Sequence, residues 1–361
     1  MERSEALKRL LDETGFAAAQ RVPLAGDAST RRYERLVLPE RRAVLMDAPP
    51  TAETLPCPPG ATPAERRQLG WNAMARLAAS RVEAFAAVSQ YLSSIGLAAP
   101  EIYGADIEAG YMVLEDLGDA LYARVIAEDG ADELELYRAA AEVLAHTHAA
   151  PVPSRMNGPG GAAWPLLEYD ALALEVNVDL FAEWMPRAAN VRMSDADRAR
   201  WESIRDALIV KALGFPRAFT IRDYHAENLL WMPEREGLKR VGLLDYQDAV
   251  RGWRGWDFAM LLDDARRDVS EAARETAVRT YLDLTGADDA GFRRELAVLG
   301  VLNAMRILGR FAQLSHEGKT KYAAFMPREW GHLARNLKHP ALADARAFVE
   351  DVARPYLEQA A

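Results

Sequence analysis

The chain has 361 residues, of which 50% are hydrophobic and 27% are charged, and its formal net charge is −10. This length and composition are typical of one large or two ordinary globular domains, and the sequence contains neither a long apolar run nor the apolar core of a signal peptide. The negative charge disfavours nucleic acid and anionic membranes as partners, and Cys57, the only cysteine, excludes an internal disulfide. We therefore predict a cytoplasmic protein with a small-molecule partner, and favour a monomer.

The N-terminal part of the chain alternates between predicted helices and strands. In chain order we predict a helix over 3–15, a hairpin over 21–38, a strand over 43–46, helix in two pieces over 64–95, and two strands over 100–115. The stretch between 47 and 63 contains six prolines, which predicts a mobile loop.

The rest of the chain is mainly helical by the same criteria. We predict a helix over 133–149, a Pro/Gly-rich loop over 151–165, mostly helix over 166–213, a β-rich segment over 218–246, and helices from 256 onward with breaks near 286, 318 and 340. A small β-rich part thus precedes a larger helical part. This organisation predicts an α+β fold with two lobes, residues 1–115 and 116–361, and a cleft between them.

Polar residues stand at the ends of the two predicted strands within the β-rich segment. Asp223 and Asn228 precede the first strand, and Asp245 ends the second. Pairing of these strands in a hairpin would bring all three residues to the same end. Carboxylate and amide oxygens suit Mg²⁺, a hard octahedral ion. A carboxylate that does not hold the metal is then free to accept a proton from a hydroxyl nucleophile.

This spacing resembles the catalytic segment of protein kinases, in which an Arg-Asp pair precedes an Asn and a strand-ending Asp follows. The more specific resemblance is to the aminoglycoside phosphotransferase-like small-molecule kinases, because Asp245 is followed by Asp248, and Asp257 stands between Trp256 and Phe258 at a later helix start. The resemblance implies a two-lobed kinase-like fold that uses ATP and Mg²⁺. It also implies that Asp223 is the catalytic base and that Asn228 and Asp245 hold Mg²⁺.

Each of these residues also has a structural alternative. Asp223 and Asn228 are common turn formers. Asp257 suits a helix N-cap as well as a supporting role at the site. Asp248 is as compatible with a turn as with a third carboxylate beside the metal, and we interpret His225 as a residue that supports the loop.

The kinase resemblance implies that the turn near Gly26 covers the nucleotide phosphates. Ser29 and Thr30 would offer hydroxyl groups there, and Arg31 and Arg32 would offer positive charge. Because the turn has one glycine rather than three, a plain hairpin turn is the alternative.

Residues 112–118 resemble the segment that connects the two lobes of such kinases. By that resemblance, backbone groups at Glu115 and Leu117 would hydrogen-bond adenine. Glu83 is the candidate for the helix-borne glutamate of the nucleotide lobe, although it could equally be a solvated helix residue.

The lysine that usually binds phosphate in this fold is missing. Met46 occupies its expected position on the third strand, and no lysine occurs anywhere between residues 8 and 211. An arginine would have to replace it, as a planar fork rather than a point charge. Arg31, Arg32 and Arg42 are the candidates, and we favour the first two.

Further segments narrow the resemblance to the bacterial anomeric sugar kinases of cell-wall recycling, which phosphorylate N-acetylmuramate and N-acetylglucosamine at the C1 hydroxyl. The matching segments are residues 26–33, 45–50, 114–119, 261–268, 306–311, 318–319 and 326–328. The resemblance covers nearly the whole chain, and it implies a sugar substrate.

Two helical stretches would then supply contacts to the acceptor. Glu175, Asp179 and Trp184 offer carboxylates for sugar hydroxyls and a ring for stacking, although the carboxylates would equally suit the ammonium groups of an aminoglycoside. Arg306 and Arg310, one helical turn apart, would hold the lactyl carboxylate of N-acetylmuramate. The alternatives are a solvated acidic helix face and a surface arginine pair.

Other functions remain open at this point. Within the enzyme class, the acceptor could be an aminoglycoside, choline or homoserine. In a different class, Met46 and the single glycine of the turn would suit a nucleotide-binding module without catalysis. Asp223, Asn228 and Asp245 argue against such a module, because it has no use for a base.

Overall fold

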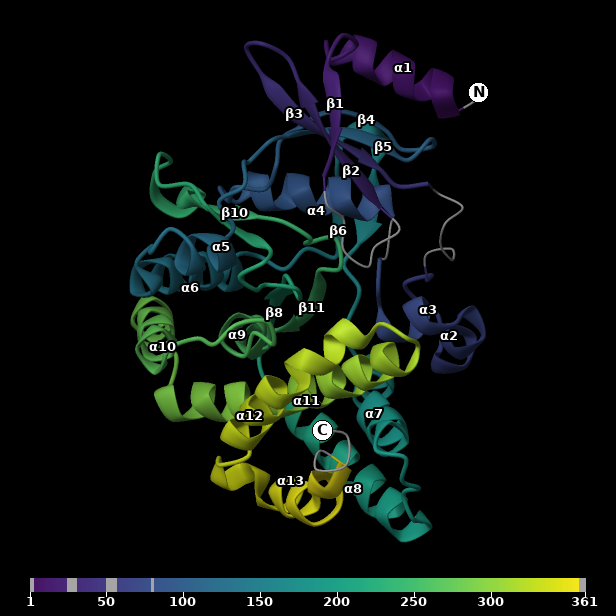
Figure 1. Ribbon diagram of the computed structural model, residues 1–361, viewed down its shortest axis with the longest axis vertical. Coiled ribbons are helices and arrows are strands. Elements are labelled where there is room, and N and C mark those ends of the chain that lie inside the picture. The colour runs from purple at the N-terminus through teal and green to yellow at the C-terminus, as the bar shows by residue number, and fades with distance from the viewer. Residues whose placement is uncertain (1–2, 25–30, 50–56, 79–80, 357–361) are drawn as a thin grey trace. The chain divides into compact units, whose positions relative to one another are not determined.

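The computed structural model describes residues 3–24, 31–49, 57–78 and 81–356, and it confirms an α+β architecture (Figure 1). The chain forms two compact units. Unit 1 comprises the chain up to Leu167 together with Ile221–Val250, and unit 2 comprises Glu168–Thr220 and everything from Arg251 onward.

The two units do not divide at residue 115. The segment Ile221–Val250 belongs to unit 1 because its backbone pairs there: the amide of Leu243 donates to the carbonyl of Ala98 at 2.9 Å, and the amide of Trp231 donates to the carbonyl of Ala120 at 2.8 Å. The boundaries 1–115 and 116–361 therefore do not coincide with the compact units. As a division between nucleotide and catalytic functions, they remain a prediction.

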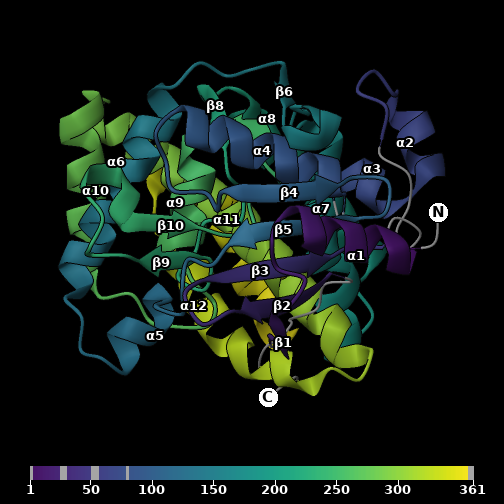
Figure 2. The same ribbon diagram turned by 90° about the horizontal axis from the view of Figure 1, so that it is seen from above.

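Unit 1 contains an antiparallel sheet of five strands in the order β1-β2-β3-β5-β4, which Figure 2 shows from above. The strands are β1 (Gln20–Pro23), β2 (Arg32–Val37), β3 (Arg42–Asp47), β4 (Ile102–Asp106) and β5 (Tyr111–Glu115). This sheet confirms the predicted N-terminal hairpin, the following strand and the two strands before residue 115.

Helix α1 (Arg3–Glu13) packs against β4 and β5 of this sheet. Its buried residues Ala6, Leu10 and Leu11 recur at helical spacing and share one face. Leu10 and Leu11 join a hydrophobic cluster with Leu45 and Val113 of the sheet. Burial of this apolar face, rather than helix propensity, holds the helix in place.

The helix predicted in two pieces over 64–95 is three helices: α2 (Pro63–Leu69), α3 (Trp71–Ala75) and α4 (Val82–Ser94). The chain turns sharply at Gly70 (φ 94°) and again at Arg76 (φ 58°), both outside the right-handed helical region. Thr62 starts α2 by forming a capping box with Glu65. Residues 50–56 of the predicted mobile loop lie outside the described residues.

The remaining elements of unit 1 include two hairpins. They are α5 (Tyr122–Ala127), α6 (Glu133–Ala149), β6 (Arg155–Asn157), β7 (Ala163–Pro165), β9 (Leu229–Trp231) and β10 (Val241–Leu243). The predicted loop over 151–165 is thus partly wrong, because β6 and β7 pair across it and pack on α4. At Gly158 a Cβ atom would lie 2.7 Å from the backbone of Ala86, so this approach depends on glycine.

Unit 2 is built mainly from helices, with α11 at its centre, in contact with α7, α9 and α12 (Figure 1). Its helices are α7 (Ala171–Ala188), α8 (Asp195–Leu213), α9 (Arg254–Leu262), α10 (Glu271–Thr285), α11 (Asp289–His316), α12 (Met326–Asn336) and α13 (Ala343–Phe348). Strands β8 (Arg217–Thr220) and β11 (Val250–Trp253) form a small sheet. No helix in the described part of the chain could span a membrane.

Helices α7 and α11 approach each other to backbone contact. A Cβ atom on Gly309 of α11 would lie 2.2 Å from the carbonyl carbon of Leu180 in α7, so no larger residue fits at this crossing. The ring of Phe181 packs on Trp201 and Trp330, with centroids 5.6 and 5.8 Å apart. This aromatic packing joins α7 to α8 and α12.

A buried carboxyl group in α12 makes the stability of the fold depend on pH. Burial raises the pKa of Glu329 to about 7, although its neighbour His332, 3.3 Å away, opposes the shift. Between pH 4.5 and 7 the folded chain therefore holds a proton that the unfolded chain has lost. The free energy of unfolding should fall by about 3 kcal/mol as the pH rises through this range.

Urea denaturation at a series of pH values checks this expectation. The Glu329→Gln variant should lose that part of the pH dependence, because glutamine does not titrate. Glu271→Gln is the control, since Glu271 is exposed at the start of α10. Identical pH slopes for the wild type and Glu329→Gln would contradict the prediction.

Candidate active site

The β9–β10 hairpin places two of the predicted site residues at one end. Leu229 pairs with Leu243, so Asn228 and Asp245 lie just beyond the paired strands. The amide of Leu244 donates to the carbonyl of Asn228 at 2.9 Å, which extends the pairing by one further bond. The hairpin predicted from the sequence is therefore confirmed, and it lies within unit 1.

The loop before β9 joins Asp223 to Asn228. The Asn228 Nδ2 donates to the carbonyl of Asp223 at 2.9 Å and lies 3.2 Å from the Nε2 of His225. The backbone amide of Asn228 donates to the carbonyl of His225 at 2.8 Å. These bonds use the amide nitrogen inside the loop, so the Oδ1 is the atom of this side chain that could accept a donor or a cation. His225 occupies the supporting position expected for it.

Arg222 fixes the start of this loop, a role that the sequence analysis did not assign. Its guanidinium is buried and donates to the backbone carbonyls of Ala75 and Arg76 at 3.0 and 2.9 Å. The backbone of Arg222 has a φ of 82°, a strained left-handed conformation for a non-glycine residue. The end of α3 thus holds the residue that directly precedes Asp223.

Asp245 carries a partly exposed carboxylate at the other side of the hairpin end. Its side chain is 42% exposed, and its backbone is also left-handed, with a φ of 54°. Its Oδ1 accepts hydrogen bonds from the Nη2 of Arg31 at 2.6 Å and from the Nε2 of Gln247 at 3.2 Å. The carboxylate is therefore oriented by side-chain donors and still accessible to a cation.

Asp248 makes a structural contact. Its Oδ1 accepts a hydrogen bond from the backbone amide of Ala78 at 2.5 Å, which anchors the segment after α3. Burial raises the pKa of the Asp248 carboxyl, and the positive charge of Arg222 acts in the opposite direction. Of the two alternatives for this residue, the contact with Ala78 favours the structural one.

Arg31 is the predicted phosphate-binding residue that the structure brings to this end of the hairpin. Besides its bond to Asp245, its Nη1 donates to the Oε1 of Gln247 at 2.7 Å. Ser29 and Thr30 lie outside the described residues, so their predicted contacts with phosphate remain predictions.

The other arginine candidates lie elsewhere. Arg32 is exposed and pairs across the sheet with Asp47, and the Nε of Arg42 lies 3.8 Å from Asp116. Met46 is fully buried on β3. Arg31 is therefore the candidate that the described structure supports best as a replacement for the missing lysine.

The predicted adenine-binding segment follows β5. The amide of Glu115 donates to the carbonyl of Glu101 at 2.8 Å, and its carboxylate pairs with Arg235 at 2.5 Å. Its N–H group is therefore engaged within the sheet. Leu117 is half-buried and packs on an apolar cluster that also contains Leu230. In the same unit, Glu83 forms an ion pair with Arg81 rather than with a lysine.

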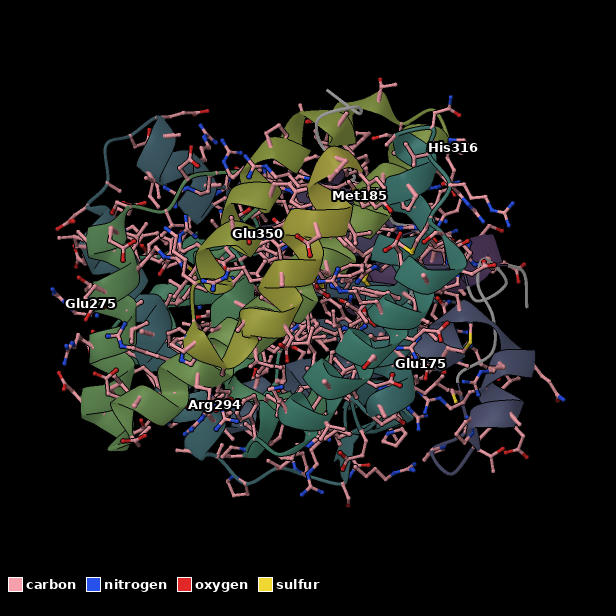
Figure 3. The ribbon with its side chains drawn as sticks, turned by 90° about the horizontal axis from the view of Figure 1, so that it is seen from below. Glu175, Met185, Glu275, Arg294, His316 and Glu350 are labelled. Carbon is pink, nitrogen blue, oxygen red and sulfur yellow. The ribbon has the colours of Figure 1, made fainter. Side chains whose placement is uncertain are left out.

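The predicted acceptor residues of α7 point to different neighbours. Asp179 accepts hydrogen bonds from the indole of Trp201 and from Arg205, both at 2.9 Å, which links α7 to α8. Trp184 lies instead beside His316 at the end of α11, with ring centroids 5.6 Å apart. Figure 3 labels Glu175 near one end of α7 and His316 near the other.

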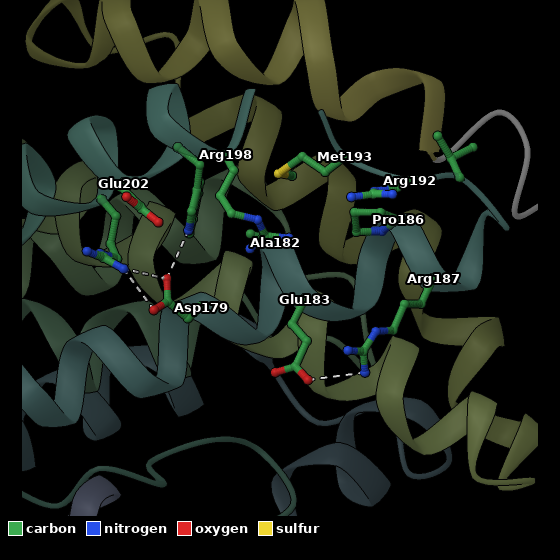
Figure 4. Close-up of a pocket in the computed structure, with 12 residues that line it drawn as sticks. Asp179, Ala182, Glu183, Pro186, Arg187, Arg192, Met193, Arg198 and Glu202 are labelled. Carbon is green, nitrogen blue, oxygen red and sulfur yellow. Dashed lines mark hydrogen bonds and ion pairs between the residues drawn. The ribbon is translucent and has the colours of Figure 1, made fainter. Parts of the chain in front are cut away.

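Asp179 also lines a surface pocket between α7 and α8, shown in Figure 4. The pocket has a volume of about 550 Å³, and its rim carries mixed charge, including an ion pair between Glu183 and Arg187.

Arg306 and Arg310 lie on α11. Arg306 is half-buried and bonds to the side chain of Asn303 at 2.8 Å, whereas Arg310 is exposed and bonds to the nearby Gln313.

Asp257 is fully buried within the first turn of α9. The N-cap of that helix is Trp253, so the N-cap alternative for Asp257 is wrong. The error arose because the sequence analysis placed the start of this helix at Trp256, whereas the helix begins two residues earlier, at Arg254.

Comparison with known proteins adds the family. The model of the phosphotransferase enzyme family matches residues 20–296. The chain belongs to this family. A Caulobacter vibrioides protein named N-acetylmuramate/N-acetylglucosamine kinase is 49% identical to this phosphotransferase, over 97% of this chain and 96% of that protein. Family membership confirms the predicted enzyme class, and it implies a nucleotide as the phosphoryl donor.

Solved structures confirm the kinase-like fold of the family. A choline/ethanolamine kinase family protein from Mesorhizobium loti superposes with a TM-score of 0.57 and 16% identity, over 97% of this chain and 99% of that chain. An ADP-bound aminoglycoside phosphotransferase gives a TM-score of 0.53 and 11% identity, over 92% and 98% of the two chains. At these identities the likeness shows the fold alone.

Proposed function

We propose that the chain is an ATP-dependent kinase that phosphorylates the anomeric C1 hydroxyl of N-acetylmuramate or N-acetylglucosamine in the recycling of the bacterial cell wall. The observation that carries this proposal is the 49% identity, over nearly the full length of both chains, with a relative named for these two sugars. In support, the end of the β9–β10 hairpin brings together Asn228 and Asp245, residues of the types that such a reaction uses. Use of ATP and a single cysteine both fit a cytoplasmic protein.

Asn228 and Asp245 fit a magnesium site. The Oδ1 of Asn228 and the accessible carboxylate of Asp245 are hard oxygen ligands at one end of the hairpin. Mg²⁺ typically takes one or two protein ligands and completes its shell with phosphate oxygens and water. When bound, Mg²⁺ neutralises charge on the transferring phosphate. Among the described residues, no group of three or more His, Cys, Asp or Glu side chains is placed to hold a metal ion by itself.

Asp223 is proposed as the base. The acceptor oxygen attacks the γ-phosphorus in line, the bond from phosphorus to the β,γ-bridging oxygen breaks, and ADP leaves. The carboxylate of Asp223 accepts the proton of the attacking hydroxyl. Arg222 and Asn228 hold the backbone on either side of Asp223. Because this chemistry rests on positioning and charge neutralisation, the hydrogen bonds that fix this loop would contribute to catalysis.

Nucleotide binding is proposed for the N-terminal residues of unit 1. Leu117 would contact the adenine from its apolar cluster, and the backbone near Glu115 would hydrogen-bond to it. Arg31 would bind phosphate in place of the missing lysine, together with Ser29 and Thr30. Arg32 stays a weaker candidate, because it is exposed on β2.

Acceptor binding is proposed for α7 and α11. Glu175 would bind sugar hydroxyls, Trp184 would stack on the sugar ring, and Arg306 would bind a carboxylate of the acceptor. Asp179 already accepts three hydrogen bonds from Trp201 and Arg205, so a sugar would have to compete with α8 for its carboxylate. For the lactyl carboxylate we favour Arg306, which is half-buried, over the exposed Arg310.

A phosphotransfer assay tests the proposal. The purified chain is incubated with ATP and Mg²⁺ and with N-acetylmuramate, N-acetylglucosamine, choline, homoserine or kanamycin, and NMR identifies the phosphorylated atom. We expect phosphate on C1 of an N-acetyl sugar. Transfer to choline, homoserine or kanamycin instead would replace the proposed substrate, and transfer to none of the five would contradict the proposal.

A further inference from the structure

The guanidinium of Arg31 occupies one oxygen of a proposed metal ligand. The Arg31 side chain is only 8% exposed, and its Nη2 lies 2.6 Å from the Oδ1 of Asp245. Gln247 joins the two: its Oε1 accepts from Arg31 at 2.7 Å, and its Nε2 donates to the same Oδ1 at 3.2 Å. Arg31 is therefore held in two directions, by a charge-assisted bond and by an amide.

This contact brings two cations into competition. A divalent ion that binds the carboxylate of Asp245 meets the positive charge of Arg31 on the same group, and like charges at such distances repel. Nucleotide phosphates remove the conflict, because their negative charge offers the guanidinium a second partner. The planar fork of arginine suits both a carboxylate and a phosphate.

We propose that Arg31 is a positioning residue that changes partners during the reaction cycle. It holds Asp245 and weakens metal binding while no nucleotide is bound. When the nucleotide binds together with its metal, Arg31 moves from Asp245 to the phosphates. The inference rests on the proposed function only for the location of the metal and the phosphates.

Two binding measurements on the intact chain test the exchange, and neither measures activity. Titration with Mn²⁺ alone, followed by electron paramagnetic resonance, reports on the metal site. Titration with ADP in the presence of EDTA reports on phosphate binding without metal. Compared with the wild type, Arg31→Gln should bind Mn²⁺ about fivefold more tightly, the size of a partly exposed ion pair, and should bind metal-free ADP about fivefold more weakly.

The opposite signs of the two changes distinguish partner exchange from a simple loss of charge. Arg21→Gln is the matched control, because it removes the same charge from another ion pair of unit 1, with Glu34 at 2.5 Å. Its Mn²⁺ affinity should equal that of the wild type. Arg31→Lys keeps the charge but loses the fork, and its Mn²⁺ affinity should lie between those of the wild type and Arg31→Gln.

Three results would overturn the inference: unchanged or weaker Mn²⁺ binding by a folded Arg31→Gln variant, unchanged binding of metal-free ADP, or the same gain in Arg21→Gln. If Arg31→Gln does not fold, wild-type Mn²⁺ affinity in Arg31→Lys has the same meaning. The phosphotransfer assay on the wild type is a separate readout. A chain that transfers no phosphate to sugar but shows the two opposite shifts would contradict the proposed function and support the partner exchange.

Discussion

Replacing Asp223 with asparagine is expected to lower kcat by at least about 10²–10⁴-fold, the usual contribution of a general base. The amide cannot take the proton of the attacking hydroxyl, yet it keeps the size of the side chain. The carbonyl of Asp223 that receives the bond from Asn228 belongs to the backbone, so the substitution leaves it in place. Binding of ADP with Mg²⁺ should stay within about twofold of the wild type.

Steady-state kinetics with the accepted sugar and calorimetry with ADP and Mg²⁺ measure the two quantities. Asp351→Asn is the matched control, because Asp351 is 63% exposed, pairs with Arg200, and has no proposed role in the reaction. A variant at position 223 that keeps more than roughly a tenth of the wild-type kcat would exclude this residue as the base.

Asp245→Asn should produce a different defect. Loss of the carboxylate charge weakens the metal site, so affinity for ADP in the presence of Mg²⁺ and kcat should both fall, the latter by about 10²–10³-fold. Binding of ADP in EDTA should not weaken, because no metal takes part in it. The substitution also weakens the bond between Arg31 and position 245, which leaves the guanidinium available to bind the phosphates of ADP.

The same calorimetric titrations, run with Mg²⁺ and with EDTA, separate the two variants. Asp223→Asn should bind the nucleotide normally under both conditions, and Asp245→Asn should bind it normally only without metal. Equal loss of affinity under both conditions in Asp245→Asn would indicate a folding defect. If Asp245→Asn bound ADP as tightly as the wild type in the presence of Mg²⁺, Asp245 would not be a metal ligand.

Residues close in sequence could be placed without the tertiary structure. Asn228 and Asp245 flank two strands that are close neighbours in the sequence, so their meeting at one hairpin end follows from local pairing alone. The N-terminal hairpin and the strands before residue 115 follow from the same kind of pattern. The kinase-like α+β fold could be predicted because the residues that carry the resemblance, Asp223, Asn228 and Asp245, lie in one short segment.

Contacts between distant segments could not be predicted. The bond from Arg31 to Asp245 joins residues 214 positions apart, and the bonds from Arg222 to the end of α3 span about 146. The sequence analysis favoured Arg31 as a phosphate ligand, but nothing in the local pattern indicated that it binds Asp245 or that Arg222 binds the end of α3. The β6–β7 hairpin was missed for a related reason, because its three-residue strands are stabilised by packing on α4.

The sequence by itself determined the family resemblance and the choice of the proposed base and the two proposed metal ligands, because each depends on residue type and short spacing. Only the tertiary structure decided that Arg31 is the arginine that reaches Asp245, and which carboxylates are already engaged. Asp179 illustrates the difference: its helical position suits a ligand, but α8 brings Trp201 and Arg205 to it. Side-chain partners across packed elements depend on how the chain folds back on itself, and hydrophobic periodicity carries no information about that pairing.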